Sequence, residues 1–154
     1  MSDPIAIASP AQLEELVSST KYVIVDFWAE WCGPCKAIAP LYAKLSKSYS
    51  VPGQLAFAKV DVDASSEIAQ KYGVTAMPSF VFIVDGDHTT GIDVQGRTLG
   101  GGTVVNDGKL VMIRGADPRN LTVIAAELGQ AAKEAAEGSA EAAPAAAEET
   151  AASA

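Results

Sequence analysis

Short apolar runs of β-forming residues alternate along this chain with segments in which apolar residues recur at helical spacing. A run that is apolar at every position predicts a strand covered on both faces, whereas recurrence at i, i+3 and i+4 predicts an amphipathic helix. The five predicted strands are 5–8, 22–28, 55–62, 80–84 and 110–114. The four predicted helices begin near Ser9, Cys35, Ser66 and Pro118, and the last of them ends at Gly129. The order βαβαβαββα predicts one α/β domain with a central sheet flanked by helices.

Local signals mark the first two helices. Ser9 at the N-cap, Pro10 at the first helical position and Gln12 two residues later predict a capping box with a favourably placed proline. Pro40 lies inside the second predicted helix, where its ring clashes with the carbonyl of Lys36. We therefore expect a kink there.

Asp26 interrupts the apolar run of the second strand, between Val25 and Phe27. A strand covered on both faces buries this carboxyl, and burial raises a carboxyl pKa because it disfavours the charged form. A raised pKa suits a proton acceptor that works near neutrality. The alternative is an ordinary acid that reaches solvent near the end of the strand.

Composition and charge exclude several classes of function. A chain of 154 residues fits one domain with a hydrophobic core. Residues 131–154, with five acids and one lysine, contribute −4 of the net charge of −8. No basic stripe is present, so we expect no nucleic-acid partner. No window holds the ~18 apolar residues of a membrane helix, so we expect no membrane association. The N-terminal Met1-Ser2-Asp3-Pro4 lacks the basic residues of a secretory signal or transit peptide, which favours the cytoplasm.

The candidate chemistry lies in Trp31-Cys32-Gly33-Pro34-Cys35, which contains the only two cysteines. It falls between a strand and a helix, where free N–H groups and the helix dipole stabilise a thiolate, the form that attacks disulfides. A second cysteine three residues on is within reach for a disulfide. Trp31 and the turn-forming Gly33-Pro34 favour a position at the surface.

Counting excludes the main alternatives for this pair. A structural zinc site needs four ligands, and the chain adds only the distant His88. Haem attachment needs histidine directly after the second cysteine, where this chain has Lys36. A secreted disulfide scaffold usually has several disulfides. We expect no metal and no cofactor other than the cysteine pair itself.

The active-site segment and several later motifs resemble the thioredoxin family over roughly residues 3–130. The matching segments are Val25–Cys35, Lys59-Val60-Asp61-Val62-Asp63, Tyr72-Gly73-Val74, Met77-Pro78-Ser79-Phe80 and Arg114-Gly115-Ala116. The resemblance implies a thioredoxin fold with a mixed five-stranded sheet. It also implies a protein-disulfide oxidoreductase that acts as a redox carrier, is kept reduced by thioredoxin reductase and acts as a monomer on disulfide-containing proteins.

Residue roles follow from the same resemblance. Cys32 would attack the substrate disulfide and Cys35 would resolve the mixed disulfide. Asp26 would accept the proton of Cys35 through water, with Lys59 moderating its charge; an ordinary exposed strand lysine is an equal alternative for Lys59. The proline after Met77 would be in cis, facing the cysteines. A flat apolar docking patch would comprise Trp31, Gly33, Pro34, Val74, Met77, Pro78, Gly115 and Ala116.

Two segments depart from the family pattern. Residues 85 to about 108 replace a tight hairpin and are rich in glycine, so we expect a flexible insertion at the end of the sheet opposite the cysteines. Two pairings of the last strand stay open: residues 110–112 with residues 103–105, or the last strand with residues 80–83 instead. Residues 131–154 contain no apolar side chain larger than alanine, so we predict a disordered tail outside a domain of residues 1–130.

Two other functions stay open at this point. A disulfide isomerase or oxidant of the same fold is disfavoured by the Gly33-Pro34 dipeptide and by the N-terminus. A chaperone-like or structural binding module, in which the thiols are dispensable, is disfavoured because both cysteines are intact.

Overall fold

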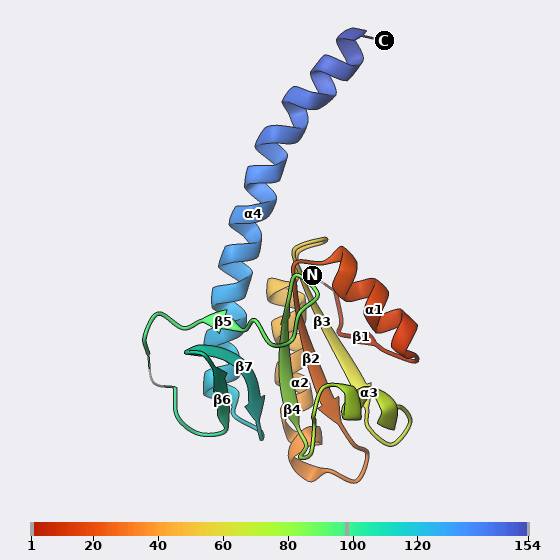
Figure 1. Cartoon of the computed structure of the whole chain (residues 1–154), viewed down its shortest axis with the longest axis vertical. Coiled ribbons are helices and arrows are strands. Elements are labelled where there is room, and N and C mark those ends of the chain that lie inside the picture. The colour runs from red at the N-terminus through yellow and green to blue at the C-terminus, as the bar shows by residue number, and fades with distance from the viewer. Residues whose placement is uncertain (1, 98, 154) are drawn as a thin grey trace.

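The computed structural model describes residues 2–97 and 99–153, with side chains described as far as residue 138. It is an α/β structure in which one mixed sheet lies between two layers of helices (Figure 1). The helices are α1 (Pro10–Ser19), α2 (Gly33–Tyr49), α3 (Ser66–Lys71) and α4 (Pro118–Ser153). The strands are β1 (Ile5–Ala6), β2 (Tyr22–Trp28), β3 (Leu55–Asp61), β4 (Ser79–Val84), β5 (Ile92–Asp93), β6 (Thr103–Asn106) and β7 (Lys109–Arg114).

The five predicted strands form the body of the sheet in the order β1-β3-β2-β4-β7. The pairs β1/β3 and β2/β3 are parallel, whereas β2/β4 and β4/β7 are antiparallel. The predicted mixed sheet and its flanking helices are confirmed. The predicted count of five strands is too low, because the segment after β4 adds β5 and β6.

Each face of the sheet has its own hydrophobic cluster. Ile24, Phe57 and Phe80 point toward α2 and α4, while Val23, Val25 and Phe27 point toward α1 and α3. This two-residue alternation places Asp26 on the α2 side, together with Ile24. The buried carboxyl therefore faces the helix that carries Cys35.

The starts of the first two helices largely follow the predicted signals. Ser9 Oγ accepts from Gln12 N–H at 3.2 Å, and Gln12 Oε1 accepts from Ala8 N–H at 2.7 Å rather than from Ser9 itself. The second helix begins at Gly33 with Cys32 as its N-cap, two residues earlier than predicted.

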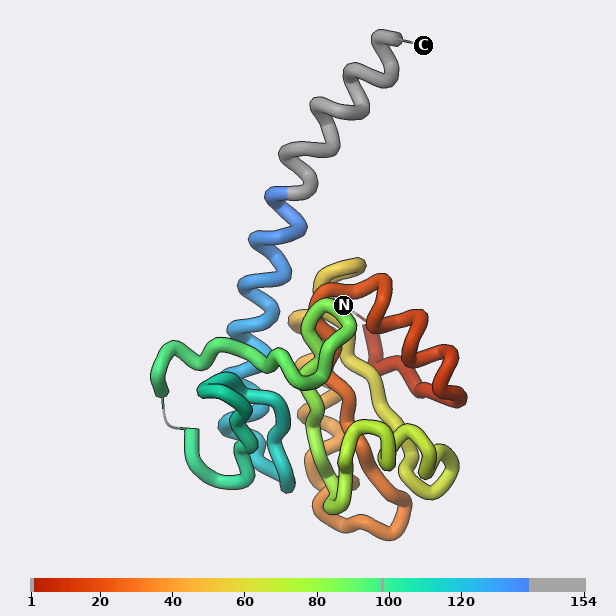
Figure 2. Tube along the Cα trace, viewed as in Figure 1, coloured from red at the N-terminus to blue at the C-terminus, as the bar shows by residue number. Residues whose placement is uncertain are grey.

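The 85–108 segment is folded against the rest of the molecule, which corrects the expectation of a flexible insertion. Its first residues lie on the α1 and α3 side, where the His88 ring packs against Tyr72, and its later part lies beside α4 (Figure 2). Ile92 and Val94 are buried in the same cluster as Ile124 and Leu128 of α4. Arg97 Nη2 donates to Glu127 of α4 at 2.7 Å.

Both pairings left open by the sequence are present, because a strand has two edges. One edge of β7 pairs with β4, where Phe80 lies opposite Ile113, and with β5. The other edge pairs with β6, where Thr103 lies opposite Ile113.

The segment also reaches the cysteine end of the sheet, which contradicts its expected position at the opposite end. Gly102 O accepts from Arg114 N–H at 2.8 Å, and the adjacent Gly115 N–H donates to Pro78 O at 2.7 Å. The far turn at residues 85–90 is only part of the segment. The chain then reaches the cysteine end at Gly102, and β6 runs from there along β7 away from Pro78.

The last helix does not stop at Gly129 as predicted. A β-carbon at residue 129 would lie 2.6 Å from Tyr49 Cδ1, so this glycine permits close contact between α4 and α2. Ala132 is fully buried in the same cluster, beyond the predicted domain boundary at residue 130. The disordered tail was predicted for residues 131–154; residues 131–153 belong to α4 in the structure, and the side chains beyond residue 138 lie outside the described ones. Among the helices described, none is long and apolar enough to cross a membrane.

Candidate functional site

The two cysteines lie where β2 leads into α2, and they form a disulfide with a Cα–Cα distance of 5.3 Å. Cys32 is the N-cap of α2, and its Sγ accepts from Cys35 N–H at 3.2 Å. Negative charge at this sulfur is stabilised by that N–H and by the helix dipole. The geometry therefore supports Cys32 as the thiolate after reduction.

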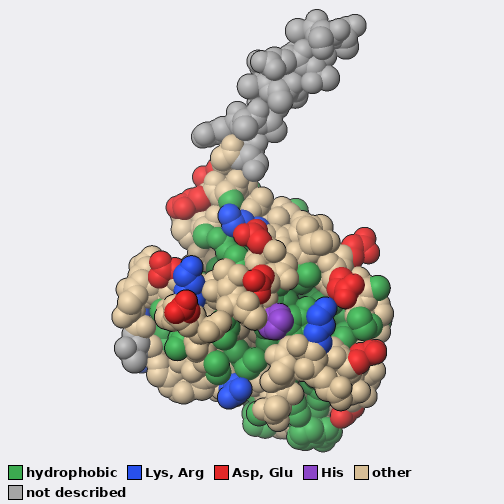
Figure 3. Space-filling model, viewed as in Figure 1, with side chains coloured by type: hydrophobic (Ala, Val, Ile, Leu, Met, Phe, Trp, Pro, Cys, Tyr) green, Lys and Arg blue, Asp and Glu red, His purple; other side chains and the backbone are tan. Residues whose placement is uncertain are grey.

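The surroundings of the pair are apolar. Cys32 and Cys35 are 4% and 2% exposed and pack with Ala29, while Trp28 and Met77 pack against this group. The expected surface position is thus only partly correct: neighbouring Trp31, Gly33 and Pro34 are exposed, but the sulfurs are covered. Apolar side chains gather at this end of the molecule, below β2 and α2 (Figure 3).

Trp31 is held in place by a partner that the sequence reasoning missed. Its indole Nε1 donates to Asp63 Oδ2 at 2.9 Å, although the side chain remains 68% exposed. Asp63 follows β3, where its backbone N–H donates to Asp61 Oδ1 at 2.9 Å. The only signal in the sequence was the parallel alignment of 22–28 with 55–62, which places the residues after each strand at one end of the sheet.

A cavity of about 360 Å³ connects Asp26 with Cys35. Lys59 lies opposite Asp26 in the parallel pairing of β2 and β3, and it also lines the cavity. The remaining lining residues include Asp3, Pro4, Trp28, Lys36 and Tyr42. The structure thus brings three of the predicted catalytic residues together around one space.

Asp26 has the electrostatic character predicted for it. It is 4% exposed, and among the described residues its Oδ1 has no hydrogen-bond partner. Burial raises the pKa of Asp26 from 3.8 to about 7, and the positive charge of Lys59 offsets part of that rise. A group with this pKa can take up or release a proton near neutrality. The alternative of a solvent-exposed acid is excluded.

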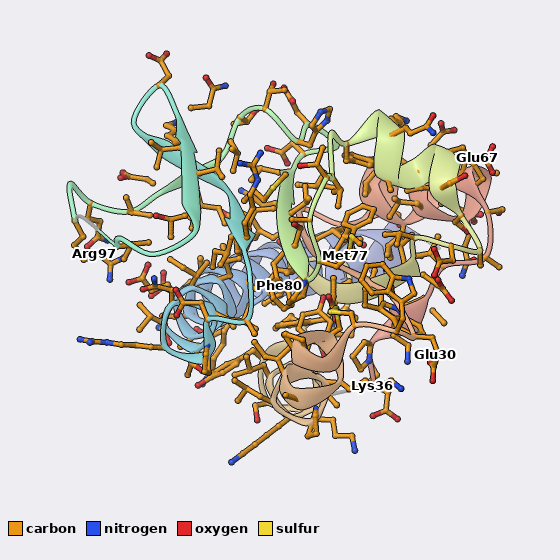
Figure 4. The ribbon with its side chains drawn as sticks, turned by 90° about the horizontal axis from the view of Figure 1, so that it is seen from below. Glu30, Lys36, Glu67, Met77, Phe80 and Arg97 are labelled. Carbon is orange, nitrogen blue, oxygen red and sulfur yellow. A yellow bond between two sulfur atoms is a disulfide. The ribbon has the colours of Figure 1, made fainter. Side chains whose placement is uncertain are left out.

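The predicted docking residues meet only in part. The Met77–Pro78 peptide bond is cis, Met77 packs against the cysteines, and Pro78 is bonded to Gly115 through the backbone. Ala116 is exposed beside Gly115. Val74 differs, since it packs against the cluster on the α1 and α3 side of the sheet. In Figure 4, which looks onto this end of the molecule, Met77 lies near the centre.

Comparison with known proteins agrees with this geometry. The thioredoxin family model matches residues 4–99, so the chain belongs to the thioredoxin family. A thioredoxin-like protein of Fusarium culmorum is 46% identical over 133 residues, covering 86% of this chain and 97% of that protein. A Neurospora crassa thioredoxin is 43% identical over 137 residues, covering 88% of this chain and 95% of that protein.

Solved structures show the same likeness. Malassezia sympodialis thioredoxin superposes with a TM-score of 0.60 and 30% identity, covering 84% of this chain and 93% of that one. Mitochondrial thioredoxin 3 of Saccharomyces cerevisiae, in its oxidised form, gives a TM-score of 0.57 at 30% identity over 80% of this chain and 94% of that one. The chain is a protein-disulfide oxidoreductase that exchanges dithiol and disulfide through its Cys-x-x-Cys pair, and its partners are disulfide-containing substrates.

Proposed function

We propose that Cys32 is the attacking thiolate and Cys35 the resolving thiol of a protein-disulfide reductase. The observation that carries this assignment is the position of Cys32 at the N-cap of α2, with its Sγ accepting the Cys35 N–H. Cys35 lies one turn into the helix and borders the cavity of Asp26.

The reaction proceeds by two exchanges. The Cys32 thiolate attacks one sulfur of the substrate disulfide, forms a mixed disulfide and expels the other sulfur as a thiolate. Cys35 then loses its proton and attacks Cys32 Sγ, which releases the second substrate sulfur and leaves the Cys32–Cys35 disulfide. Two electrons pass from the protein to its substrate.

Asp26 is the proposed acceptor of the Cys35 proton. Its pKa of about 7 suits uptake and release of a proton at neutral pH, and it lines the same cavity as Cys35. Lys59 is the proposed moderator of the Asp26 charge. Substrates would dock over Trp31, Gly33, Pro34, Val74, Met77, Pro78, Gly115 and Ala116, the predicted patch.

Thioredoxin reductase is the proposed electron donor. The cytoplasm is the proposed location, because thiols are kept reduced there and a Cys-x-x-Cys pair in that compartment is usually catalytic rather than structural. One similar protein is mitochondrial, which makes organelle fractionation of the tagged chain the direct test of location. The proposed domain, predicted as residues 1–130, extends to include the buried Ala132, and the rest of residues 131–154 is the proposed appended tail. The chain is proposed to be a monomer.

Insulin reduction by the wild type and by Cys35→Ser tests the assignment. We expect the wild type to turn over and Cys35→Ser to stop after one attack, holding substrate on Cys32 as a mixed disulfide. Limited alkylation of the reduced wild type, followed by mass mapping, should label Cys32 first. Full turnover by Cys35→Ser would favour a binding module with dispensable thiols, and first labelling of Cys35 would reverse the two roles.

A further inference from the structure

Residues 2–4 form a short arm that lies along the end of α2. The N–H of Ser2 donates to Ser50 Oγ at 3.1 Å, and the carbonyl of Ser2 accepts from Ser46 Oγ. Ser46 is buried, so its hydroxyl is an anchor with a fixed position. The arm is therefore attached to the fold ahead of β1.

The next two residues of the arm border the cavity between Asp26 and Cys35. Asp3 and Pro4 both line this space of about 360 Å³. Asp3 Oδ1 lies 3.3 Å from Lys47 Nζ, and this ion pair joins the arm to α2 a second time. Pro4 is half-buried and carries no charge, so its ring acts on the cavity only by covering part of it.

One face of α2 both lines the cavity and holds the arm. Ala39 and Ala43 line the cavity, while Lys47 and Ser50 bind the arm. These four positions recur at intervals of three or four residues, so they lie on the same side of the helix. The helix that carries Cys35 therefore also sets the position of the arm beside the cavity.

Two polar atoms make the contact of this cavity with solvent important. Asp26 Oδ1 and Trp28 Nε1 are buried without a hydrogen-bond partner among the described residues, and both side chains line the cavity. Buried polar groups are normally satisfied by ordered water, for which this volume has room. The amount of water that reaches Asp26 sets the cost of its charged form, because hydration stabilises a carboxylate.

The charges around the cavity do not keep the proton on Asp26. The other titratable side chains that line it are Asp3 of the arm, Lys36 and Tyr42 of α2 and Lys59 of β3. The two lysines favour the charged form of Asp26, although Lys36 also pairs with Glu30. Burial raises the pKa of Tyr42 well above its usual range, so Tyr42 is neutral. Phe80 of β4, opposite Asp26, adds no charge. Exclusion of water is therefore the main effect that favours the protonated carboxyl.

We propose that the arm of residues 2–4 is a positioning element for the proton step, in which Pro4 limits the access of bulk water to Asp26 and so keeps the proton affinity of this carboxyl high. The arm acts through Asp26 rather than on the exchanging sulfurs. This inference rests on the proposed role of Asp26 as acceptor of the Cys35 proton and adds residues 2–4 to that step.

The test is the pKa of Asp26, measured by NMR from the pH dependence of its carboxyl carbon signal in the oxidised protein, where the cysteines do not titrate. Pro4→Gly removes the ring from the cavity without changing any charge. We expect the pKa of Asp26 to fall by about one unit relative to wild type, because additional water stabilises the carboxylate.

Pro10→Gly is the matched control. Pro10 is also half-buried, but it begins α1, which packs on the other side of the sheet. The pKa of Asp26 in this variant should stay within about 0.2 unit of the wild-type value.

Ser46→Ala is a second uncharged variant, which removes the anchor of Ser2 and leaves Pro4 in the chain. It should lower the pKa of Asp26 in the same direction as Pro4→Gly. An Asp26 pKa that rises, or that stays within about 0.2 unit of wild type in both variants, would overturn the role of the arm.

A kinetic measurement separates this inference from the function on which it rests. The decay of the mixed disulfide on Cys32 is followed between about pH 5 and 9 after rapid mixing of the reduced protein with a disulfide-containing peptide. We expect the acid limb of the rate profile to move to lower pH in Pro4→Gly together with the pKa of Asp26. A wild-type profile without a limb at the measured pKa of Asp26 would instead count against Asp26 as the proton acceptor.

Discussion

Gly102 and Arg114 touch through their backbones at the cysteine end of the sheet. A β-carbon on residue 102 would lie 1.8 Å from Arg114 O, so only glycine permits the bond from Arg114 N–H to Gly102 O. This contact fixes where the 85–108 segment returns to β7. The segment is therefore attached next to Gly115 and Pro78.

Gly102→Ala should destabilise the protein. The added methyl meets backbone atoms that cannot move away as a flexible side chain would, so we expect a loss of about 2 kcal/mol, or a Tm lower by roughly 4–8 °C. Gly138→Ala is the control, because a β-carbon at residue 138 meets nothing within 4 Å. Thermal unfolding of both variants checks this, and equal melting temperatures would mean that the contact is relaxed in solution.

Val94→Ala should also destabilise the protein, because Val94 is 4% exposed within the core cluster on the α4 side. Removing two buried methyl groups costs about 2 kcal/mol. Val105→Ala makes the same change at a side chain that is 59% exposed, and we expect less than about 0.5 kcal/mol there. Urea unfolding of the two variants compares their free energies of unfolding directly. Similar losses in both variants would show that the segment is the flexible insertion expected from the sequence.

Asp26→Asn should raise stability at alkaline pH and slow turnover. The folded pKa is about 7 against an ordinary 3.8, so the native state binds the proton more tightly than the unfolded chain. The carboxyl thus favours folding at low pH, and this benefit is lost as pH rises from about 4 through 7. Above that range, the cost of the buried charge is on the order of 4 kcal/mol, which asparagine removes.

Urea unfolding of oxidised wild type and Asp26→Asn near pH 4 and pH 8 measures this difference. The gain of the variant should be present near pH 8 and absent near pH 4. Turnover of insulin should fall at least about tenfold, since a proton acceptor is lost. A variant that is less stable than wild type near pH 8 would contradict the electrostatic account of Asp26.

Two truncations should separate the packed part of α4 from the predicted tail. Removal of residues 131–154 takes away Ala132, which is fully buried, and should lower the Tm by about 2–4 °C, near 1 kcal/mol. Removal of residues 139–154 alone should change the Tm by less than about 1 °C. Differential scanning calorimetry resolves these shifts in Tm. A drop in Tm well above about 1 °C on removal of residues 139–154 alone would show that the tail docks on the domain.

The site was predictable because its signals are local. The two cysteines, the helix start and the acid in an apolar strand all lie within residues 22–36. The continuous apolar run of residues 22–28 was sufficient to predict a buried Asp26, and the structure confirms its burial. The bond from Trp31 to Asp63 was missed because it joins two loops whose contact depends on strand register.

The incorrect predictions arose at residue types that serve two different structural roles. Glycine permits unusual backbone conformations, but it also permits close approach, as at Gly102 and at Gly129 against Tyr49. From the first role, we predicted a flexible insertion at residues 85–108 and an end of the last helix at Gly129. Alanine gave no signal of burial at Ala132, because a methyl group suits both a solvent-exposed helix and a tight helix contact.

The 85–108 segment also changes what the sheet exposes at its border. Without β6, the outer edge of β7 would offer the unpaired N–H and C=O groups of a six-residue strand. The edge is now β6, which has four residues and a register shift between Val104 and Val105. Short, irregular edges are poor templates for strand addition. A protein that exchanges disulfides with other polypeptides can thus present an apolar face to them while offering little edge for them to add to as strands.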